Sequence, residues 1–449
     1  MYAPHTEHDV REMLDVIGVT SLDALAAPPR GLAIAGELDV PPAMPESVAY
    51  QHLRELSRKN QTGDADSSFL GAGAYRHYQP PAVPYLATRS EFITAYTPYQ
   101  AEASQGSLQA IFEWQTYICL LTGLDVSNAS VYDGSTALVE GVIMASQATG
   151  SKRVVVSAAL HPGYRAVLKT YAEGMGIEIV DAPLRSDGTT EIPASMDGAA
   201  AYVVQSPNFY GCIEDVAAGA KAAHAAKALC VEVIVEAMSL GALKTPGESG
   251  ADIAVGEGQS FGLPVGYGGP YVGFVATTKE HVRRLPGRLV GETHDVDGRK
   301  AYVLTLQGRE QHIRRELASS NICTNQALCA LFATIYLATV GAHGLRSIAA
   351  ANMARARDLR KALLSLDGVT ARFDAPFFNE FVVRLPLSAR RVADALSAHD
   401  IVAGLPLSRL GAGGENDMLV CATEMTSADG IARFAARLKE MMDHAVAAV

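Results

Sequence analysis

The 449-residue sequence has little of what marks several large classes of protein. Its six cysteines show neither a CxxC pair nor any zinc-type spacing, and a chain of this size does not depend on disulfide staples. Its 37 Lys and Arg against 48 Asp and Glu give a net charge of -11, which disfavours a protein that binds phosphate backbones. We therefore expect reduced, structural cysteines, no metal site and no nucleic-acid partner.

A basic leader and a long uninterrupted hydrophobic run are also missing. The first residues carry acids and helical periodicity, so they are not typical of a secretory signal. The most apolar segment starts at Ala327, but it is alanine-rich and is closed by Gly341 and His343, which favours a buried helix over a membrane span. We expect a cytoplasmic protein with no membrane partner.

What the sequence does have is a regular alternation of helical and extended patterns from about Gln105 onward. Amphipathic or alanine-rich stretches such as 107–123, 135–150 and 216–228 alternate with apolar runs such as 153–160 and 251–256. This order predicts an α/β fold with a mostly parallel sheet between helices. We expect three parts: a helical arm (residues 1–68), a large α/β domain (69–325) and a smaller α+β domain (326–449).

A glycine-rich loop follows one of the predicted strands, at Gly256 to Phe274, with the sequence GEGQSFGLPVGYGGPYVGF. Glycines serve where the backbone needs a positive φ or lies close to another group. The loop contains a formal G-x-S-x-G match, which would make Ser260 the nucleophile of a serine hydrolase. Pro264 and the glycines that follow prevent the supporting helix that such a nucleophile requires, so we keep the hydrolase only as a remote alternative.

Several polar residues follow predicted strands or open predicted helices, where ligands of α/β sheets gather. Ser135 and Thr136 open a helix and could bind a phosphate, although capping by Asp133 or Ser135 is the simpler interpretation. His161 could stack on a planar group or only be hydrogen-bonded. Glu236 ends a strand, and it could pair with a protonated ring nitrogen or be solvated.

A run of charges, from Arg309 to Glu316, has the spacing of a helix. Its arginines and glutamates lie three or four residues apart, as in surface ion pairs. We expect an exposed, salt-bridged helical face there.

Long segments in a fixed order resemble the glycine cleavage system P-protein family. The similarity covers essentially the whole chain, and the first residues resemble subunit 1 of the form in which the enzyme is split in two. The resemblance implies the aspartate aminotransferase-like fold of pyridoxal phosphate (PLP) enzymes, fold type I. It is carried by YTPYQAEASQG, YDGSTALVEG, LHPGY, SFGLPVGYGGPYVGF, PGRLVGET, REQHIRRE and SSNICTNQAL.

The resemblance implies a role for the glycine-rich loop. The family's catalytic subunit has its Schiff-base lysine just before a phenylalanine and the glycine run, and this sequence has Gln259 there. A carboxamide nitrogen is delocalised and cannot form an aldimine, and Lys244 and Lys279 lie outside the loop. We therefore expect no catalytic residue in this chain alone and no covalent cofactor. The expected vestigial cradle comprises Ser135, Thr136, His161, Glu236 and Gln259.

The resemblance also implies partners. Subunit 1 pairs with a lysine-bearing subunit 2, as a tetramer with two of each, to decarboxylate glycine on PLP and pass the aminomethyl group to the lipoyl arm of H-protein. We expect Tyr96, Tyr99 and Gln100 to reach the partner's active site, an aromatic packing loop being the alternative. Ala101 replaces a usual proline and Leu317 a usual lysine. A pure scaffold that docks H-protein is the second functional hypothesis.

Overall fold

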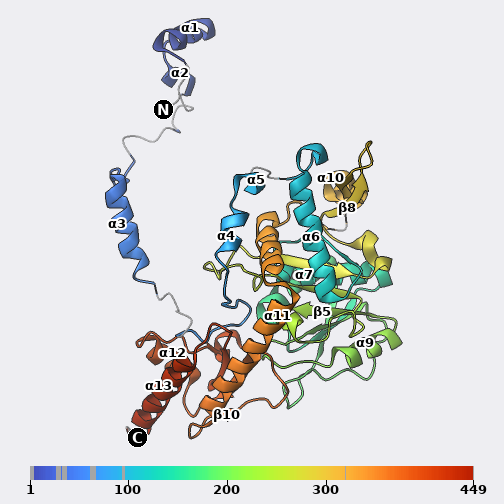
Figure 1. Cartoon of the computed structure of the whole chain (residues 1–449), viewed down its shortest axis with the longest axis vertical. Helices are drawn as coiled ribbons and strands as arrows, with labels where there is room; N and C mark the ends of the chain where they lie inside the picture. Colours follow the sequence, from blue (N-terminus) through green and yellow to red (C-terminus); the bar gives the residue numbers. More distant parts are fainter. Residues whose placement is uncertain are drawn as a thin grey trace. The chain divides into compact units, whose positions relative to one another are not determined.

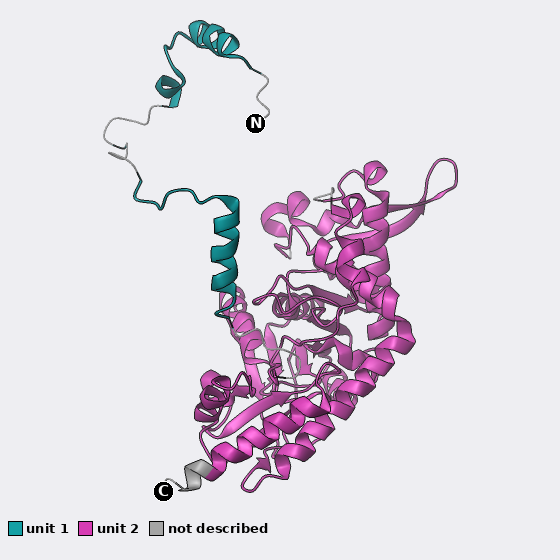
Figure 2. Ribbon diagram, turned by 60° about the vertical axis from the view of Figure 1, so that its left-hand side comes forward, with its two compact units in different colours: residues 1–61 teal, residues 62–449 magenta. Residues whose placement is uncertain are grey.

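The computed structural model describes residues 5–26, 32, 38–60, 67–93, 97–318 and 320–447, without the side chains of 444–447. The chain divides into two compact units, residues 1–61 and 62–449 (Figure 2). The first unit holds α1 (Glu7–Ile17), α2 (Leu22–Ala26) and α3 (Glu46–Ser57). Thr6 and Asp9 form a reciprocal capping box at the start of α1, which satisfies N–H groups that a helix start leaves free.

A seven-stranded sheet forms the centre of the second unit (Figure 1). Its order is β1-β7-β6-β5-β4-β2-β3, and the neighbours from β6 through β3 are all parallel. Only β7 runs against β6 and β1. The strands are β1 (Val126–Ser127), β2 (Arg153–Ser157), β3 (Glu178–Ala182), β4 (Ala201–Gln205), β5 (Leu229–Ile234), β6 (Ile253–Glu257) and β7 (Gly273–Thr277).

Helices cover both faces of this sheet. Alternate residues such as Val231 and Val255 pack with α7 (Gly134–Thr149) and α8 (Pro162–Met175) in one core cluster. Their neighbours point the other way, since side chains alternate along a strand. Cys230 joins α9 (Val216–Ala225), and Ala254 joins α6 (Gln105–Thr122) and α11 (Ala327–Leu364). The predicted α/β fold with a mostly parallel sheet is confirmed.

The apolar segment at Ala327 forms the first part of α11. Within the described residues, α11 is the helix long and apolar enough to cross a membrane, and 44% of its most apolar window is buried. A core helix passes the same test, and α11 packs against α6 and α4 (Ala82–Ala87). Gly341, at φ 61° and ψ -179°, interrupts its helical geometry.

A four-stranded antiparallel sheet, in the order β10-β11-β13-β12, follows α11. Its strands are β10 (Thr370–Ala371), β11 (Glu380–Arg384), β12 (Leu405–Pro406) and β13 (Asp417–Cys421). It packs with α12 (Ala389–Ser397) and α13 (Ala428–Ala447), and α13 lies beside α11 (Figure 1). A separate hairpin joins β8 (Leu289–His294) to β9 (Lys300–Thr305). The boundaries expected at residues 68 and 325 stay a prediction.

The expected salt-bridged helix from Arg309 to Glu316 is wrong. The segment holds only one α-helical turn, α10 (Gln311–Arg314), between the 3-10 turns η4 (Gln307–Arg309) and η5 (Arg315–Leu317). Among the described residues its one ion pair joins His312 and Glu310 at 3.8 Å. Glu310 is extended, at φ -82° and ψ 156°, and Arg315 has a positive φ of 53°. Helical geometry is therefore interrupted inside the run, and helical spacing in sequence does not become a shared helical face. All six cysteines are unpaired.

Candidate functional site

Gln259 lies in the turn after β6, and its amide is fully used. The side chain is 1% exposed. Its Oε1 accepts the backbone N–H of Tyr75 at 2.9 Å, and its Nε2 donates to the carbonyls of Tyr75 at 2.9 Å and Leu263 at 2.8 Å. A delocalised amide with both N–H groups donated cannot act as an amine nucleophile.

Glu257 places a carboxyl group at the N-terminus of α7. Its Oε2 accepts the N–H of Gly134 at 3.0 Å, and its Oε1 accepts those of Gln259 at 3.1 Å and Val272 at 2.9 Å. Burial raises the pKa of Glu257 to about 8, against the effect of these N–H donors. The helix end that commonly binds a phosphate is therefore occupied by the chain's own carboxyl group.

The hydroxyls of Ser135 and Thr136 point to Asp133. Asp133 Oδ1 accepts from the Ser135 hydroxyl at 2.7 Å, the Thr136 hydroxyl at 3.0 Å and the Thr136 N–H at 2.8 Å. This is an ordinary N-cap, so the capping interpretation of this turn is confirmed.

His161 caps α8 and holds the chain at Ala72. Its Nδ1 accepts the N–H of Gly163 at 3.1 Å, which leaves Nε2 protonated to donate to the Ala72 carbonyl at 3.0 Å. Burial lowers the pKa of His161, in agreement with a neutral ring. A Cβ on Gly73, which has φ +106°, would lie 2.9 Å from Nε2. The Nε2 edge of the ring is thus covered by residues 72 and 73.

Glu236 pairs with the ring of a second histidine. His77 Nε2 lies 3.2 Å from Glu236 Oε2, and His77 Nδ1 lies 2.8 Å from Glu424 Oε2. Burial alone would lower the pKa of His77, but the two carboxylates raise it to about 10. Asn379 Nδ2 donates to the same Glu236 oxygen at 3.1 Å, and the Met238 N–H donates to the other at 2.8 Å. Glu236 is not solvated.

Residues 72–77 connect several of these groups. Glu380 accepts the Ala72 N–H at 2.6 Å and the Tyr75 hydroxyl at 2.7 Å, while burial raises its pKa to about 7. Gln259, His161 and Glu236 hold the same segment. The residues present do not fit PLP, because the amine is absent, the anion end is filled by Glu257 and the Glu236 carboxylate is already paired. The sequence interpretation missed Glu257 and His77.

Ser260 has no activating base. Its hydroxyl is buried and has no hydrogen-bond partner within the described part of the chain, and turns instead of a helix follow it. An active serine needs a base within hydrogen-bond reach, so the geometry gives the hydrolase alternative no support.

The aromatic loop expected to reach a partner is described from Thr97 onward, and Tyr96 lies outside the described residues. Tyr99 is 60% exposed. The buried Arg288 donates to its hydroxyl at 3.0 Å and to Asn325 Oδ1 at 3.2 Å. Gln100 is exposed and precedes η1 (Ala101–Ala103). Tyr99 is therefore exposed, and the buried Arg288 guanidinium both binds its hydroxyl and lies 5.1 Å from the centre of its ring.

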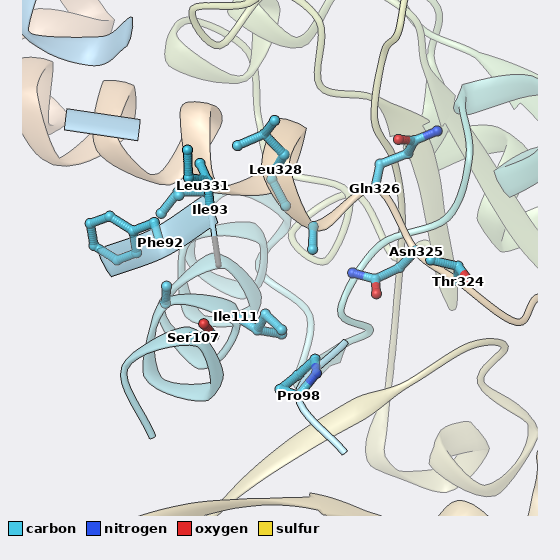
Figure 3. A pocket seen from close by; sticks show the side chains of 13 residues that line it. Phe92, Ile93, Pro98, Ser107, Ile111, Thr324, Asn325, Gln326, Leu328 and Leu331 are labelled. Carbon is cyan, nitrogen blue, oxygen red and sulfur yellow. The ribbon is translucent and has the colours of Figure 1, made fainter. Parts of the chain in front are cut away.

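A cavity of about 370 Å³ lies beside this loop. It is formed by α5 (Ser90–Ile93), Pro98, α6 and the chain entering α11. Its apolar and polar side chains gather at opposite ends (Figure 3), the first including Phe92, Ile93, Leu328 and Leu331 and the second Thr324, Asn325 and Gln326. Asn325 joins the cavity to Arg288 and so to Tyr99.

Comparison with known proteins gives consistent matches. The family described as glycine cleavage system P-protein matches residues 1–438. A probable glycine dehydrogenase (decarboxylating) subunit 1 of Moorella thermoacetica is 48% identical and covers 98% of this chain and 99% of its own. The corresponding protein of Anaeromyxobacter dehalogenans is 49% identical over the same shares.

Solved structures agree with these relatives. A crystal structure of glycine decarboxylase (P-protein) of the glycine cleavage system, in inhibitor-bound form, matches with a TM-score of 0.90 and 47% identity, covering 98% of this chain and 99% of that one. Sphingosine-1-phosphate lyase of Burkholderia pseudomallei matches with a TM-score of 0.65 at 14% identity, covering 91% of this chain and 93% of that one. The second match shows only that the fold is shared.

Proposed function

This chain belongs to the glycine cleavage system P-protein family, and from that membership we propose that it works as subunit 1 of a glycine dehydrogenase (decarboxylating). The proposed partner is a lysine-bearing subunit 2, in a heterotetramer with two subunits of each kind. The assembled enzyme would decarboxylate glycine and pass the aminomethyl group to the lipoyl arm of H-protein. We propose the cytoplasm as its location.

The observation that carries the proposal is the bonding of Gln259. Both N–H groups and the oxygen of its amide are bound to backbone atoms of Tyr75 and Leu263. In this proposal PLP, which supplies an electron sink when bound, is held by subunit 2 and not by this chain. The residues at positions 135, 136, 161, 236 and 259 then keep the shape of a cradle without a ligand.

The chain's own contribution would come from the loop at Tyr96, Tyr99 and Gln100. Arg288 fixes the Tyr99 hydroxyl at the surface, where it can meet a group of the partner subunit. Positioning of this kind matters, since a small misplacement of reacting groups can cost roughly a hundredfold in rate. A pure scaffold that docks H-protein remains the second candidate. Under that hypothesis the Tyr99 hydroxyl has no role in turnover.

The test is a visible absorbance spectrum with PLP, combined with reconstitution. The purified chain, subunit 2 and their mixture are each titrated with PLP and assayed for glycine decarboxylation with lipoylated H-protein. We expect a protonated-aldimine band from subunit 2 and from the mixture, none from this chain, and turnover only in the mixture. A band and carbon dioxide release from this chain alone would overturn the proposal.

A further inference from the structure

A second cavity, of about 570 Å³, lies away from the cradle and is lined by three arginines. Arg283 belongs to the 3-10 turn η3 (Lys279–Arg284), Arg309 ends η4 and Arg314 ends α10. Leu306, which directly precedes η4 and has a φ of +52°, lines the same cavity. Leu306 and Leu317 complete an apolar part of the wall.

These arginines lack the partners that such side chains usually have. Among the described residues no side-chain hydrogen bond or ion pair involves any of the three guanidinium groups, whereas Arg384, for example, binds Asp417 through two nitrogens. The Nε and Nη2 atoms of Arg309 are buried without a hydrogen-bond partner. Leaving a buried charged donor unpaired costs more than the roughly 1–3 kcal/mol of a neutral group.

One acidic group lies close to this cluster. Glu310 is 7% exposed, one of its oxygens has no partner, and its charge acts on Arg309 without forming a hydrogen bond. Its negative charge offsets one of the three positive charges. It accepts no hydrogen bond from the free N–H groups of Arg309. The cavity thus keeps a surplus of positive charge together with unused donors.

We propose that this cavity binds an oxyanion of the carboxylate or phosphate class. A guanidinium presents two parallel N–H groups that match the oxygen spacing of both groups, and three of them around one hollow suit an anion with two or more negative charges. The net charge of -11 opposes long-range attraction of anions, so affinity here comes from direct contact. This inference does not depend on the proposed function.

The direct test is calorimetric titration of the full chain with inorganic phosphate and with malonate, at an ionic strength held constant with sodium chloride. We expect saturable binding of at least one of them. Arg309→Gln and, separately, Arg314→Gln should weaken it about tenfold, since a charged hydrogen bond contributes roughly 1.5–3 kcal/mol. Arg299→Gln is the matched control, because Arg299 is exposed and pairs with Asp297. Thermal melts of each variant establish that it is folded.

Titration of the complex with subunit 2 distinguishes the source of the oxyanion. If phosphate or malonate still binds, the occupant is a free anion. If binding is lost and the same arginine substitutions weaken assembly, the occupant is an acidic group of the partner. The proposal is overturned if neither anion binds the chain saturably, if Arg309→Gln and Arg314→Gln bind as Arg299→Gln does, or if binding is lost on assembly while the substitutions leave assembly unchanged.

Discussion

Gln259 and Tyr75 exchange two hydrogen bonds across 184 positions of sequence, each 2.9 Å long, from side-chain amide to backbone N–H and carbonyl. The amide thereby completes the hydrogen bonding of a buried chain segment as a neighbouring strand would. Gln259 is therefore a structural link between the loop after β6 and residues 72–77.

We expect Gln259→Met to destabilise the chain by about 3 kcal/mol. Methionine fits a similar volume but leaves the Tyr75 N–H and two carbonyls without partners, at roughly 1–3 kcal/mol for each buried group left unsatisfied. The measurement is the free energy of unfolding from urea titration. Gln109→Met, at an exposed position, should change it by less than about 0.5 kcal/mol. Equal effects of the two substitutions would contradict the structural role of Gln259.

Gly73→Ala is expected to cost clearly more than Gly150→Ala. Both glycines have positive φ, which strains alanine by roughly 1–2 kcal/mol. The added Cβ at position 73 would also lie 2.9 Å from His161 Nε2, while at position 150 it would meet nothing within 4 Å. The difference between their unfolding free energies therefore contains the contact with His161 together with the larger backbone strain at φ +106°, compared with φ +74° at position 150. Equal costs would mean that the contact with His161 is loose.

The large sheet could be predicted from sequence because its strands are local patterns. Runs such as 153–157 and 253–257 are buried on both faces, and such strands are near-continuous hydrophobic runs in any protein. The N-cap of α7 was equally readable, since Asp133, Ser135 and Thr136 stand next to one another.

The contacts within the chain that occupy the expected cofactor cradle could not be predicted in the same way. Glu257 and Gly134 are 123 positions apart, and His77 and Glu424 are 347 apart; no periodicity connects them. The sequence feature that indicates a site residue here is a carboxylate at the end of an apolar strand. We used it to select Glu236, but it applies equally to Glu257. The prediction of a helix over Arg309–Glu316 failed because Glu310 is extended and Arg315 has a positive φ, and this backbone geometry overrides the helical spacing of the sequence.

Tyr99→Phe should lower the turnover of the assembled enzyme roughly tenfold or more and leave the melting temperature of the lone chain unchanged. The hydroxyl is held by Arg288 at an exposed position, so its loss removes a positioned group and little packing. Tyr171→Phe, on the outer part of α8, is the control and should leave turnover as in the wild type. An unchanged rate with Tyr99→Phe would favour the scaffold hypothesis.

Ser260→Ala is expected to be neutral or to stabilise the chain by up to about 1 kcal/mol. Within the described part of the chain the buried hydroxyl has no partner, and a buried polar group without one is destabilising. Turnover of the assembled enzyme should not change, and a fluorophosphonate probe should label the wild type and the variant equally little. Labelling that depends on Ser260 would revive the hydrolase alternative.

His77→Gln should show how far the ion pairs with Glu236 and Glu424 stabilise the fold, and its effect should depend on pH. The two carboxylates raise the pKa of His77 from 6.5 to about 10 despite burial. A raised pKa means that the folded chain binds the proton more tightly, so the contribution is complete below pH 6.5 and is lost as pH rises toward 10. Within that window it falls by roughly 1 kcal/mol per pH unit.

The measurement is the difference in free energy of unfolding between wild type and His77→Gln at pH 6, 8 and 9.5. We expect about 3–5 kcal/mol at pH 6, typical of breaking a buried pair, and a steady decrease above it. His224→Gln, which removes an exposed pair with Asp252, should change stability by less than about 1 kcal/mol. A difference for His77→Gln that stays constant from pH 6 to 9.5 would mean that the ring is neutral in the folded chain, and Glu236 would then lack the cationic partner that occupies it.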